Sequence, residues 1–414
     1  MLTRFTPHNL DGEHVTKTDA FFQSQKPAAV LKHALLHRYL TPYVTMLGSF
    51  SQHIWLVDAY AGPGTYDADE TGKGTPGSPK IICDLATAQA ERGLHVHGTF
   101  IERDPIHVQR LRSLVSQADP AHERHTVIEG DAQEHLEAVS NRAGSDPLLL
   151  FLDPFGTGLS FATLTAAVRA RPAGASTEIL LNFNLEAVWR IGGLLNHEGR
   201  SLADEKTLTR VDGFLGGTWW REHFVTVRDE HAASAAAAAR SVASQFRARV
   251  YNEIGLRSLA VPIRRRPNHE PLFLLTLFYT HPAAPATFIE AASGANQEWR
   301  AYNRQRDLEA ELERIGEGRL FPSEWDQELS DSELERVETE LESEWVAQIV
   351  ENIRRHAQER SELPLADTLP LIYGETLALA RTKHLRQAWD QLATEGVVQP
   401  RTTRGRLWKL VIRR

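Results

Sequence analysis

Short apolar runs alternate with stretches of helical spacing between residues 54 and 184, and this alternation constrains the possible folds more than any other feature. The runs are "IWLVDAY", "VHGTFIERD", "HTVIEGDA", "PLLLFLDPFG" and "TEILLNFN". Several are apolar along their whole length, which is typical of parallel strands that helices cover on both faces. We therefore expect an α/β domain whose first five strands are parallel.

Two later runs extend the predicted sheet. "RSLAVPIRRR" and "PLFLLTLFYTH" are separated by the turn-like "PNHE", which predicts an antiparallel hairpin after a long helix over 234–255. A further helix is expected over 26–48, before the first strand, because apolar residues recur there at helical spacing. The expected architecture is a seven-stranded, Rossmann-like sheet with helices on both faces.

The first predicted strand ends in "VDAYAGPG", where Asp58 and Tyr60 precede Gly62 and Gly64. Ligands of such folds bind at the carboxyl ends of the strands, and glycine lets the backbone approach a ligand closely. A tight strand-to-helix turn without a ligand explains this G-x-G pattern equally well. The segment 67–79, rich in Gly, Thr and Pro, is expected to be a loop.

Acidic residues also close the next two predicted strands. Glu102 ends the second, where an acid can accept hydrogen bonds from both hydroxyls of a ribose. Asp131 ends the third in "IEGDA", a place from which it can accept a hydrogen bond from an adenine amino group. Each acid has the alternative role of capping the following helix. Three acids and a glycine loop at successive strand ends favour an adenosyl ligand.

These motifs resemble those of a known family. "VDAYAGPG" looks like the D-x-F-A-G-x-G motif of class I S-adenosylmethionine-dependent methyltransferases, with Tyr60 in place of the usual Phe. The combination of "LKHALLHRYL", "DAYAGPG", "GSP", "FIERD" and "FLDPFG" resembles, over residues 32–281, the three-Cys-motif partner (TcmP) family. This resemblance implies a methyltransferase-like domain, a separate partner protein with a three-cysteine motif, and S-adenosylmethionine held by Asp58, Tyr60, Gly62, Gly64, Glu102 and Asp131.

The candidate catalytic segment is "LDPFG", with Asp153, Pro154 and Phe155 at the end of the fourth strand. Amino-methyltransferases carry D/N-P-P-Y/F at this position, where the acid and a backbone carbonyl hold the target amine and the aromatic ring stacks on a base. Here Phe155 replaces the second proline and Gly156 the aromatic residue, so Phe155 would supply the stacking surface one position early. A purely structural Asp-Pro turn is the alternative.

Other polar residues are weaker candidates for the same edge of the sheet. Asn182 and Asn184 end the fifth strand, where they can contact a substrate or satisfy local backbone groups. Lys32 and His33 on the first helix, and Lys73 in the loop, are candidates for the entrance, although solvated positions explain them as well. Of these three we favour only Lys32, because it falls in the family-like stretch.

The C-terminal residues predict a winged helix-turn-helix: two helices, then a strand, a basic turn and a strand in "VVQPRTTRGRLWKLVIRR". It is similar to the module found at the end of the same family. Contact with nucleic acid and docking onto protein are both open. The expected phosphate contacts are Arg401, Arg404, Arg406 and Lys409, and the basic residues expected along the second helix are Arg381, Lys383 and Arg386.

Charge is distributed unevenly along the chain. The net charge is −8, yet residues 306–345 hold four basic and fifteen acidic residues, whereas residues 364–414 hold nine Lys/Arg and four Asp/Glu. The acidic part is expected to be a solvated helical pair, with mimicry of nucleic acid as the alternative. We thus expect an N-terminal helical segment (1–50), a methyltransferase-like domain (51–305), an acidic helical arm (306–362) and a winged helix-turn-helix (363–414).

Composition excludes several classes of protein. The single cysteine, Cys83, excludes a disulfide framework and a multi-cysteine metal site, and it is expected in the core. No cluster of possible ligands has metal-binding spacing, and no apolar run has transmembrane length, so neither a metal nor a membrane is expected. A cytoplasmic methyltransferase acting on a nucleobase, nucleotide or nucleic acid is the predicted function. The alternative is a non-catalytic adaptor that recruits nucleic acid or the partner protein.

Overall fold

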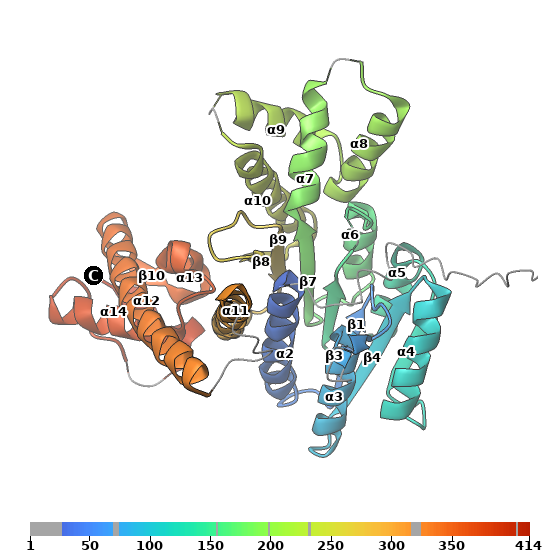
Figure 1. Ribbon diagram of the computed structural model, residues 1–414, viewed down its shortest axis with the longest axis horizontal. Coiled ribbons are helices and arrows are strands. Elements are labelled where there is room, and N and C mark those ends of the chain that lie inside the picture. Colours follow the sequence, from blue (N-terminus) through green and yellow to red (C-terminus); the bar gives the residue numbers. More distant parts are fainter. Residues whose placement is uncertain are drawn as a thin grey trace, which may run out of the picture.

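A seven-stranded sheet forms the centre of the computed structural model (Figure 1), which describes residues 27–68, 74–154, 156–197, 199–230, 233–315, 324–402 and 405–414. The strand order across the sheet is β5-β4-β1-β6-β7-β9-β8. The strands are β1 (His53–Asp58), β4 (His95–Glu102), β5 (His125–Glu129), β6 (Leu148–Leu152), β7 (Thr177–Asn184), β8 (Arg257–Ile263) and β9 (Phe273–Tyr279).

The strand directions confirm the predicted fold class. β5, β4, β1, β6 and β7 are parallel, and β9 lies antiparallel between β7 and β8. A sheet of five parallel strands continued by an antiparallel hairpin, in this order, is the class I methyltransferase fold. The carboxyl ends of β1, β4, β6 and β7 therefore meet at one edge, which is where ligands bind in such sheets.

Helices cover both faces because successive strand residues point to opposite sides. Leu56 of β1 belongs to the core beneath one face, and its neighbour Val57 belongs to the core beneath the other. The first core is shared with α2 (Pro27–Leu47), α3 (Ser78–Ala90), α4 (Pro105–Ala118) and α11 (Ala284–Ile315). The second is shared with α5 (Ala132–Arg142), α6 (Phe161–Arg169) and α10 (Ala235–Ile254).

The segment predicted as a loop over 67–79 is partly ordered into strands. β2 (Thr65–Ala68) and β3 (Gly74–Pro76) pair as a small antiparallel ribbon, and α3 begins at Ser78. The prediction of an unbroken loop was therefore wrong, because two short strands in a segment rich in Gly, Thr and Pro give no period-two pattern to detect.

The described part of residues 185–230, for which no element is predicted above, contains α-helices that stand together at the top of Figure 1. They are α7 (Leu185–Gly192), α8 (Leu202–Leu215) and α9 (Trp219–Glu230). Asn184 ends β7 and also caps α7, since its side chain accepts a hydrogen bond from the N–H of Ala187. The chain thus leaves the site edge of the sheet directly into this helical group.

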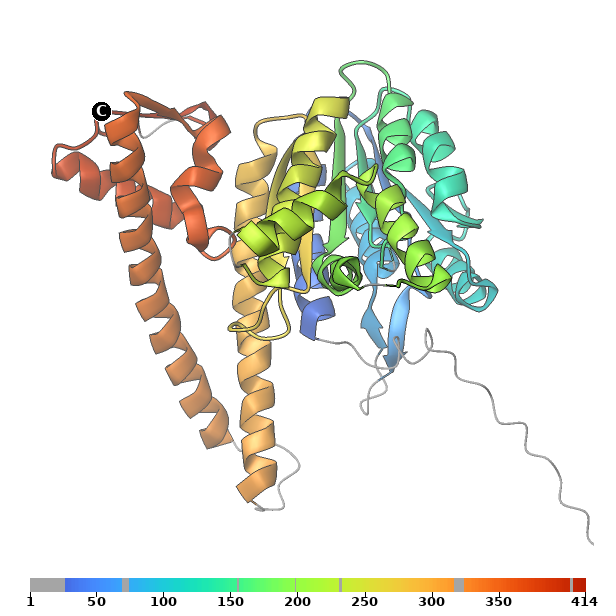
Figure 2. The ribbon, with the colours of Figure 1, turned by 90° about the horizontal axis from the view of Figure 1, so that it is seen from above.

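Two long helices, α11 and α12 (Glu324–Glu359), extend beside the sheet domain, as Figure 2 shows. α11 packs against α2, where the ring centroids of Phe288 and Tyr39 lie 5.4 Å apart in an edge-to-face arrangement. The helical form expected for the acidic residues is confirmed within the described part of α12. Their carboxylates form ion pairs with α11, as between Arg300 and Glu338 (2.6 Å, both largely buried).

The C-terminal residues form α13 (Leu365–Tyr373), α14 (Thr382–Thr394) and a two-stranded ribbon. β11 (Val411–Arg413) pairs with β10 (Glu362–Pro364), which precedes α13. The second strand predicted for the wing is formed as β11 and pairs with β10, and after α14 the N–H of Gln399 donates a 2.7 Å hydrogen bond to the carbonyl oxygen of Arg413. The four-part division of the chain remains a prediction.

Candidate functional site

The loop between β1 and β2 has the backbone geometry that its glycines predict. Gly62 and Gly64 have φ values of 61° and 86°, in the left-handed region that favours glycine. A Cβ atom on Gly64 would lie 2.9 Å from Cδ1 of Leu114, so α4 packs directly against the loop. The N–H of Gly77 donates a 3.0 Å hydrogen bond to the carbonyl oxygen of Gly64, which ties the loop to the start of α3.

Backbone N–H groups hold both carboxylate oxygens of Glu102 at the end of β4. Oε2 accepts a hydrogen bond from Gly62 at 2.8 Å, and Oε1 accepts from Arg103 at 2.9 Å and Asp104 at 2.8 Å. Hydrogen bonds of this kind to an ionised carboxylate are strong, so the orientation of the side chain is fixed. A carboxylate accepts about four hydrogen bonds, and capacity therefore remains for a ligand.

Two cavities lie on either side of Tyr60 at this edge of the sheet. The cavity next to β4, which we call the β4 cavity, has a volume of about 60 Å³ and is lined by Tyr60, Ile101, Glu102, Arg103, Gly130 and Asp131. The β6 cavity has a volume of about 140 Å³, and its lining includes Lys32, Tyr60, Gly64, Ser78, Asp153 and Asn182. The predicted glycine loop, acids and Asp-Pro segment therefore meet around two adjoining spaces.

Asp58 lies behind the loop and lines neither cavity. Its side chain is fully buried, and Oδ1 accepts a 3.1 Å hydrogen bond from the N–H of Tyr60. Burial raises the pKa of Asp58 to about 7, against hydrogen bonding from the Ser78 side chain and the Tyr60 backbone, which lower it. Asp58 therefore fixes the backbone at the start of the glycine loop and does not face either cavity.

Asp131 caps α5, because its Oδ1 accepts a 2.9 Å hydrogen bond from the N–H of Gln133. It lines the β4 cavity as well. The two roles weighed for this residue are therefore compatible, since the cap uses only one of its two oxygens.

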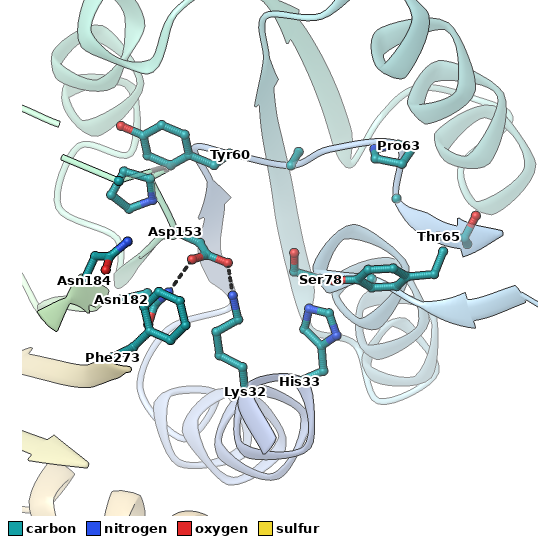
Figure 3. A pocket seen from close by; sticks show the side chains of 16 residues that line it. Lys32, His33, Tyr60, Pro63, Thr65, Ser78, Asp153, Asn182, Asn184 and Phe273 are labelled. Atoms are coloured by element: carbon teal, nitrogen blue, oxygen red, sulfur yellow. Dashed lines mark hydrogen bonds and ion pairs between the residues drawn. The ribbon is translucent and has the colours of Figure 1, made fainter. Parts of the chain in front are cut away.

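Asp153 is held from two sides in the β6 cavity (Figure 3). Its Oδ2 accepts a hydrogen bond from Nζ of Lys32, and its Oδ1 accepts one of 2.6 Å from Nδ2 of Asn182. Lys32 and Asn182 are 7% and 2% exposed. Because an ionised carboxylate only accepts hydrogen bonds, the amide nitrogen of Asn182 must face it, which leaves the amide oxygen free. That oxygen is buried and has no hydrogen-bond partner among the described residues.

The remaining walls of the β6 cavity are aromatic and polar. Phe273, the first residue of β9, places its ring 5.9 Å from Nζ of Lys32. On the other side, the rings of His33 and Tyr66 lie 5.5 Å apart. Burial lowers the pKa of His33 to about 3, and the nearby charge of Lys32 lowers it further against the opposite effect of Asp153. His33 is therefore neutral at physiological pH and supplies no charge.

The sequence did not indicate every residue of the two cavities. Phe273 was missed because it joins the site through the antiparallel pairing of β9, in which it lies opposite Asn184. Arg103 was missed although it directly follows Glu102. Three residues named above, Lys73, Phe155 and Arg404, lie outside the described residues.

The basic residues of the C-terminal part are placed differently from one another. Arg386 and Arg406 are exposed. Arg401 forms a two-pronged ion pair with Asp390, with distances of 2.7 and 2.9 Å. Lys383, at the start of α14, pairs with Glu342 of α12 at 2.5 Å.

The start of α14 is therefore packed against the protein itself. Its first N–H, that of Thr382, donates to Glu290 of α11, and Arg381 donates to Gln297 of the same helix. In helix-turn-helix proteins this end of the second helix contacts bases. In this structure that end faces α11 and α12.

Searching the described ranges for metal sites and membrane spans gives no candidate. No group of three or more His, Cys, Asp or Glu side chains there has a geometry that holds a metal ion. None of the helices in this part of the chain combines the length and apolarity needed to cross a membrane. Cys83 is buried in the core, as expected, and burial raises the pKa of its thiol to about 12.

Comparisons with known proteins add little to this geometry. No family model matches the sequence, and no curated protein matches it. Among solved structures, an S-adenosylmethionine-dependent methyltransferase from Geobacter sulfurreducens, in complex with S-adenosyl-L-homocysteine, is 13% identical. The match covers 63% of this chain and 94% of that one, with a TM-score of 0.28.

Two further matches are of the same kind. A methyltransferase from Thiobacillus denitrificans, also in complex with S-adenosyl-L-homocysteine, is 13% identical over 63% of this chain and 95% of its own, with a TM-score of 0.27. The methyltransferase domain of bacterial CtHen1 is 11% identical over 60% of this chain and 100% of its own, with a TM-score of 0.30. These TM-scores are too low to support a conclusion about this chain. The fold class is therefore assigned from the strand order and directions.

Proposed function

We propose that this chain is an S-adenosylmethionine-dependent methyltransferase. The observation that carries the proposal is Glu102, whose carboxylate is held by three backbone N–H groups beside the β4 cavity. An acid fixed at the end of the second parallel strand is suited to accept hydrogen bonds from the two hydroxyls of a ribose. The glycine loop lies next to it, since Gly62 donates to this carboxylate and Gly64 lines the adjoining β6 cavity.

The residues present fit an adenosyl group that passes Tyr60. The adenosine would lie in the β4 cavity with Glu102 and Asp131, and the methionine end would lie along the loop toward the β6 cavity. When bound, S-adenosylmethionine supplies an electrophilic methyl group. Asp153 would hold the acceptor group in line with it, because methyl transfer depends mainly on proximity and alignment.

A nucleobase, nucleotide or nucleic acid is the proposed acceptor. The Asp-Pro pair at the end of β6 and the exposed Arg386 and Arg406 in the C-terminal part support this choice. A partner protein with a three-cysteine motif and a C-terminal winged helix belong to the proposal through the resemblance to the TcmP family.

Calorimetric titration with S-adenosyl-L-homocysteine tests the proposal. We expect saturable binding by the wild-type chain and its loss in Glu102→Ala, while Glu129→Ala binds normally. Glu129 is a matched control because it ends the adjacent strand β5, pairs with Arg112 at 3.1 Å and lines neither cavity. Circular dichroism of both variants separates loss of the site from loss of the fold. Absence of binding by the folded wild-type chain, alone and with its partner, contradicts the proposal.

One observation favours the second candidate, a non-catalytic adaptor. Lys32 and Asn182 each donate to one oxygen of Asp153, so this carboxylate already has a structural role within the chain. An adaptor keeps its binding to nucleic acid or partner in Asp153→Asn, whereas a methyltransferase loses turnover. Measuring both quantities on this variant distinguishes the two.

A further inference from the structure

A lysine of this chain occupies the place where a methyl acceptor would be held. Lys32 extends from α2 into the β6 cavity, and its ammonium group donates a hydrogen bond to Asp153, as Figure 3 shows. The lysine is only 7% exposed and the side chain of Asp153 is 24% exposed, so the pair is partly buried and differs from a surface ion pair. It joins residues that are 121 positions apart in the sequence.

The surroundings of this nitrogen are those of a built amine site. The ring of Phe273 lies 5.9 Å from Nζ, a distance at which aromatic faces attract ammonium groups. Asn182 fixes the second oxygen of Asp153 at 2.6 Å. Its own amide oxygen, buried and without a partner in the described part of the chain, offers one more acceptor for an N–H group.

We propose that Lys32 is itself a methyl acceptor, so that the chain methylates its own Nζ atom. This inference rests on the proposed function, in which the methyl group of S-adenosylmethionine faces Asp153. Lys32 and Gly64 line the same cavity, so no part of the chain has to unfold for the amine to face a ligand held by the glycine loop.

The reaction balances without a further reagent. Nζ gives up one proton, which Asp153 accepts and passes to water, and the freed lone pair forms the new nitrogen–carbon bond. The sulfur–carbon bond breaks, and its electron pair stays on sulfur, which changes from a sulfonium ion to a neutral thioether. The methylated lysine regains its positive charge at neutral pH. Its ion pair with Asp153 and its contact with the Phe273 ring are therefore retained.

Lys80 provides a matched control within the same chain. It also forms a lysine–aspartate pair, with Nζ 2.6 Å from Oδ1 of Asp84, but it is exposed on α3 and lines neither cavity. Chemical methylation by free S-adenosylmethionine would modify this accessible amine at least as fast as the buried one. Selective labelling of Lys32 therefore indicates a reaction inside the cavity.

The test is incubation of the purified full-length chain with S-adenosylmethionine carrying a deuterated methyl group, followed by intact-mass measurement and peptide mapping. We expect label on Lys32 at least about tenfold above that on Lys80, because a held nucleophile reacts faster than a free one. Lys32→Arg, which keeps a cation beside Asp153, should remain unlabelled. Circular dichroism of Lys32→Arg shows whether this variant keeps the fold of the wild type.

Each other result overturns the inference. If the chain binds the cofactor saturably but Lys32 stays unlabelled, the inference of self-methylation is contradicted and the proposed function is unaffected. Equal labelling of Lys80, or undiminished labelling of Lys32→Arg, shows that the label arises elsewhere. Absence of cofactor binding removes both this inference and the proposed function, and calorimetry distinguishes that case from the first.

Discussion

The backbone N–H of Gly62 donates a 2.8 Å hydrogen bond to Oε2 of Glu102, and this contact joins the glycine loop after β1 to the acid that ends β4. Two separate sequence motifs therefore form one structural unit. The loop sets the orientation of the carboxylate, and the carboxylate in turn satisfies an N–H group of the loop that is buried. A substitution in the glycine loop should therefore alter the orientation of the Glu102 carboxylate, and a substitution of Glu102 should alter the loop.

Gly77→Ala tests how closely the loop is held. Gly77 has an ordinary φ of −85°, so alanine introduces no backbone strain, but its Cβ would lie 2.8 Å from the carbonyl oxygen of Gly64. That oxygen belongs to rigid backbone, and the loop must shift. We expect a loss of about 1–3 kcal/mol in the free energy of unfolding, measured with urea, and weaker binding of S-adenosylmethionine.

Gly213→Ala is the control for this substitution. A Cβ at Gly213, within α8, meets nothing within 4 Å, so alanine should raise stability by up to about 1 kcal/mol through helix propensity. If Gly77→Ala and Gly213→Ala stabilised the protein equally, the loop would accommodate the added Cβ without cost, and the expected tight packing at Gly77 would be contradicted.

Glu178→Gln should stabilise the protein in a pH-dependent way. Glu178 is 5% exposed, and burial raises its pKa to about 7, although the hydrogen bond from the hydroxyl of Tyr39 lowers it. The folded state thus binds this proton more tightly than the unfolded state, where the carboxyl has its ordinary pKa of 4.5. The favourable contribution is complete below pH 4.5 and is lost as the pH rises through 7.

Glutamine keeps an acceptor for Tyr39 and removes the ionisation. Its advantage over glutamate in urea unfolding should therefore grow between about pH 5 and pH 8, to at most about 3 kcal/mol. An advantage for Glu178→Gln that is constant across this range contradicts the assignment.

The exposed arginines of the C-terminal part should carry any binding of nucleic acid there. Replacing Arg386 and Arg406 together by glutamine should weaken binding of a fluorescent oligonucleotide and reduce the slope of log K against log salt by about two. Arg401→Gln should have a smaller effect, because this guanidinium already pairs with Asp390. Anisotropy titrations at several salt concentrations measure these quantities. Unchanged binding by the double variant would place the contact elsewhere or rule it out.

The fold was predictable because its signals are local. Fully apolar strands such as Leu148–Leu152, each followed by a helix, specify a parallel sheet, and the turn between β8 and β9 specifies the hairpin. Asp58, Gly62, Gly64 and Glu102 could be located for a related reason: each lies at or just after a strand end, and parallel strands bring those ends to one edge.

The contacts around Asp153 could not be predicted in the same way. Lys32 reaches it only because α2 packs across the sheet, and Phe273 joins the cavity only through the antiparallel register with β7. Both relationships depend on tertiary packing between distant segments. The family-like stretch named Lys32 as a candidate but did not predict its contact with Asp153, and no local pattern marked Phe273. The pairing of β11 with β10, more than forty residues earlier in the chain, could not be predicted for the same reason.

Recognition of ribose by Glu102 is the central claim, and a thermodynamic cycle tests it most directly. Calorimetry would compare S-adenosyl-L-homocysteine with its analogue lacking both ribose hydroxyls, on the wild-type chain and on Glu102→Ala. We predict that the wild type prefers the natural ligand by about 100-fold or more, since hydrogen bonds to a charged group contribute about 1.5–3 kcal/mol each, and that the variant shows little preference. Equal discrimination by the two proteins, or no binding by the folded wild type, would contradict the account.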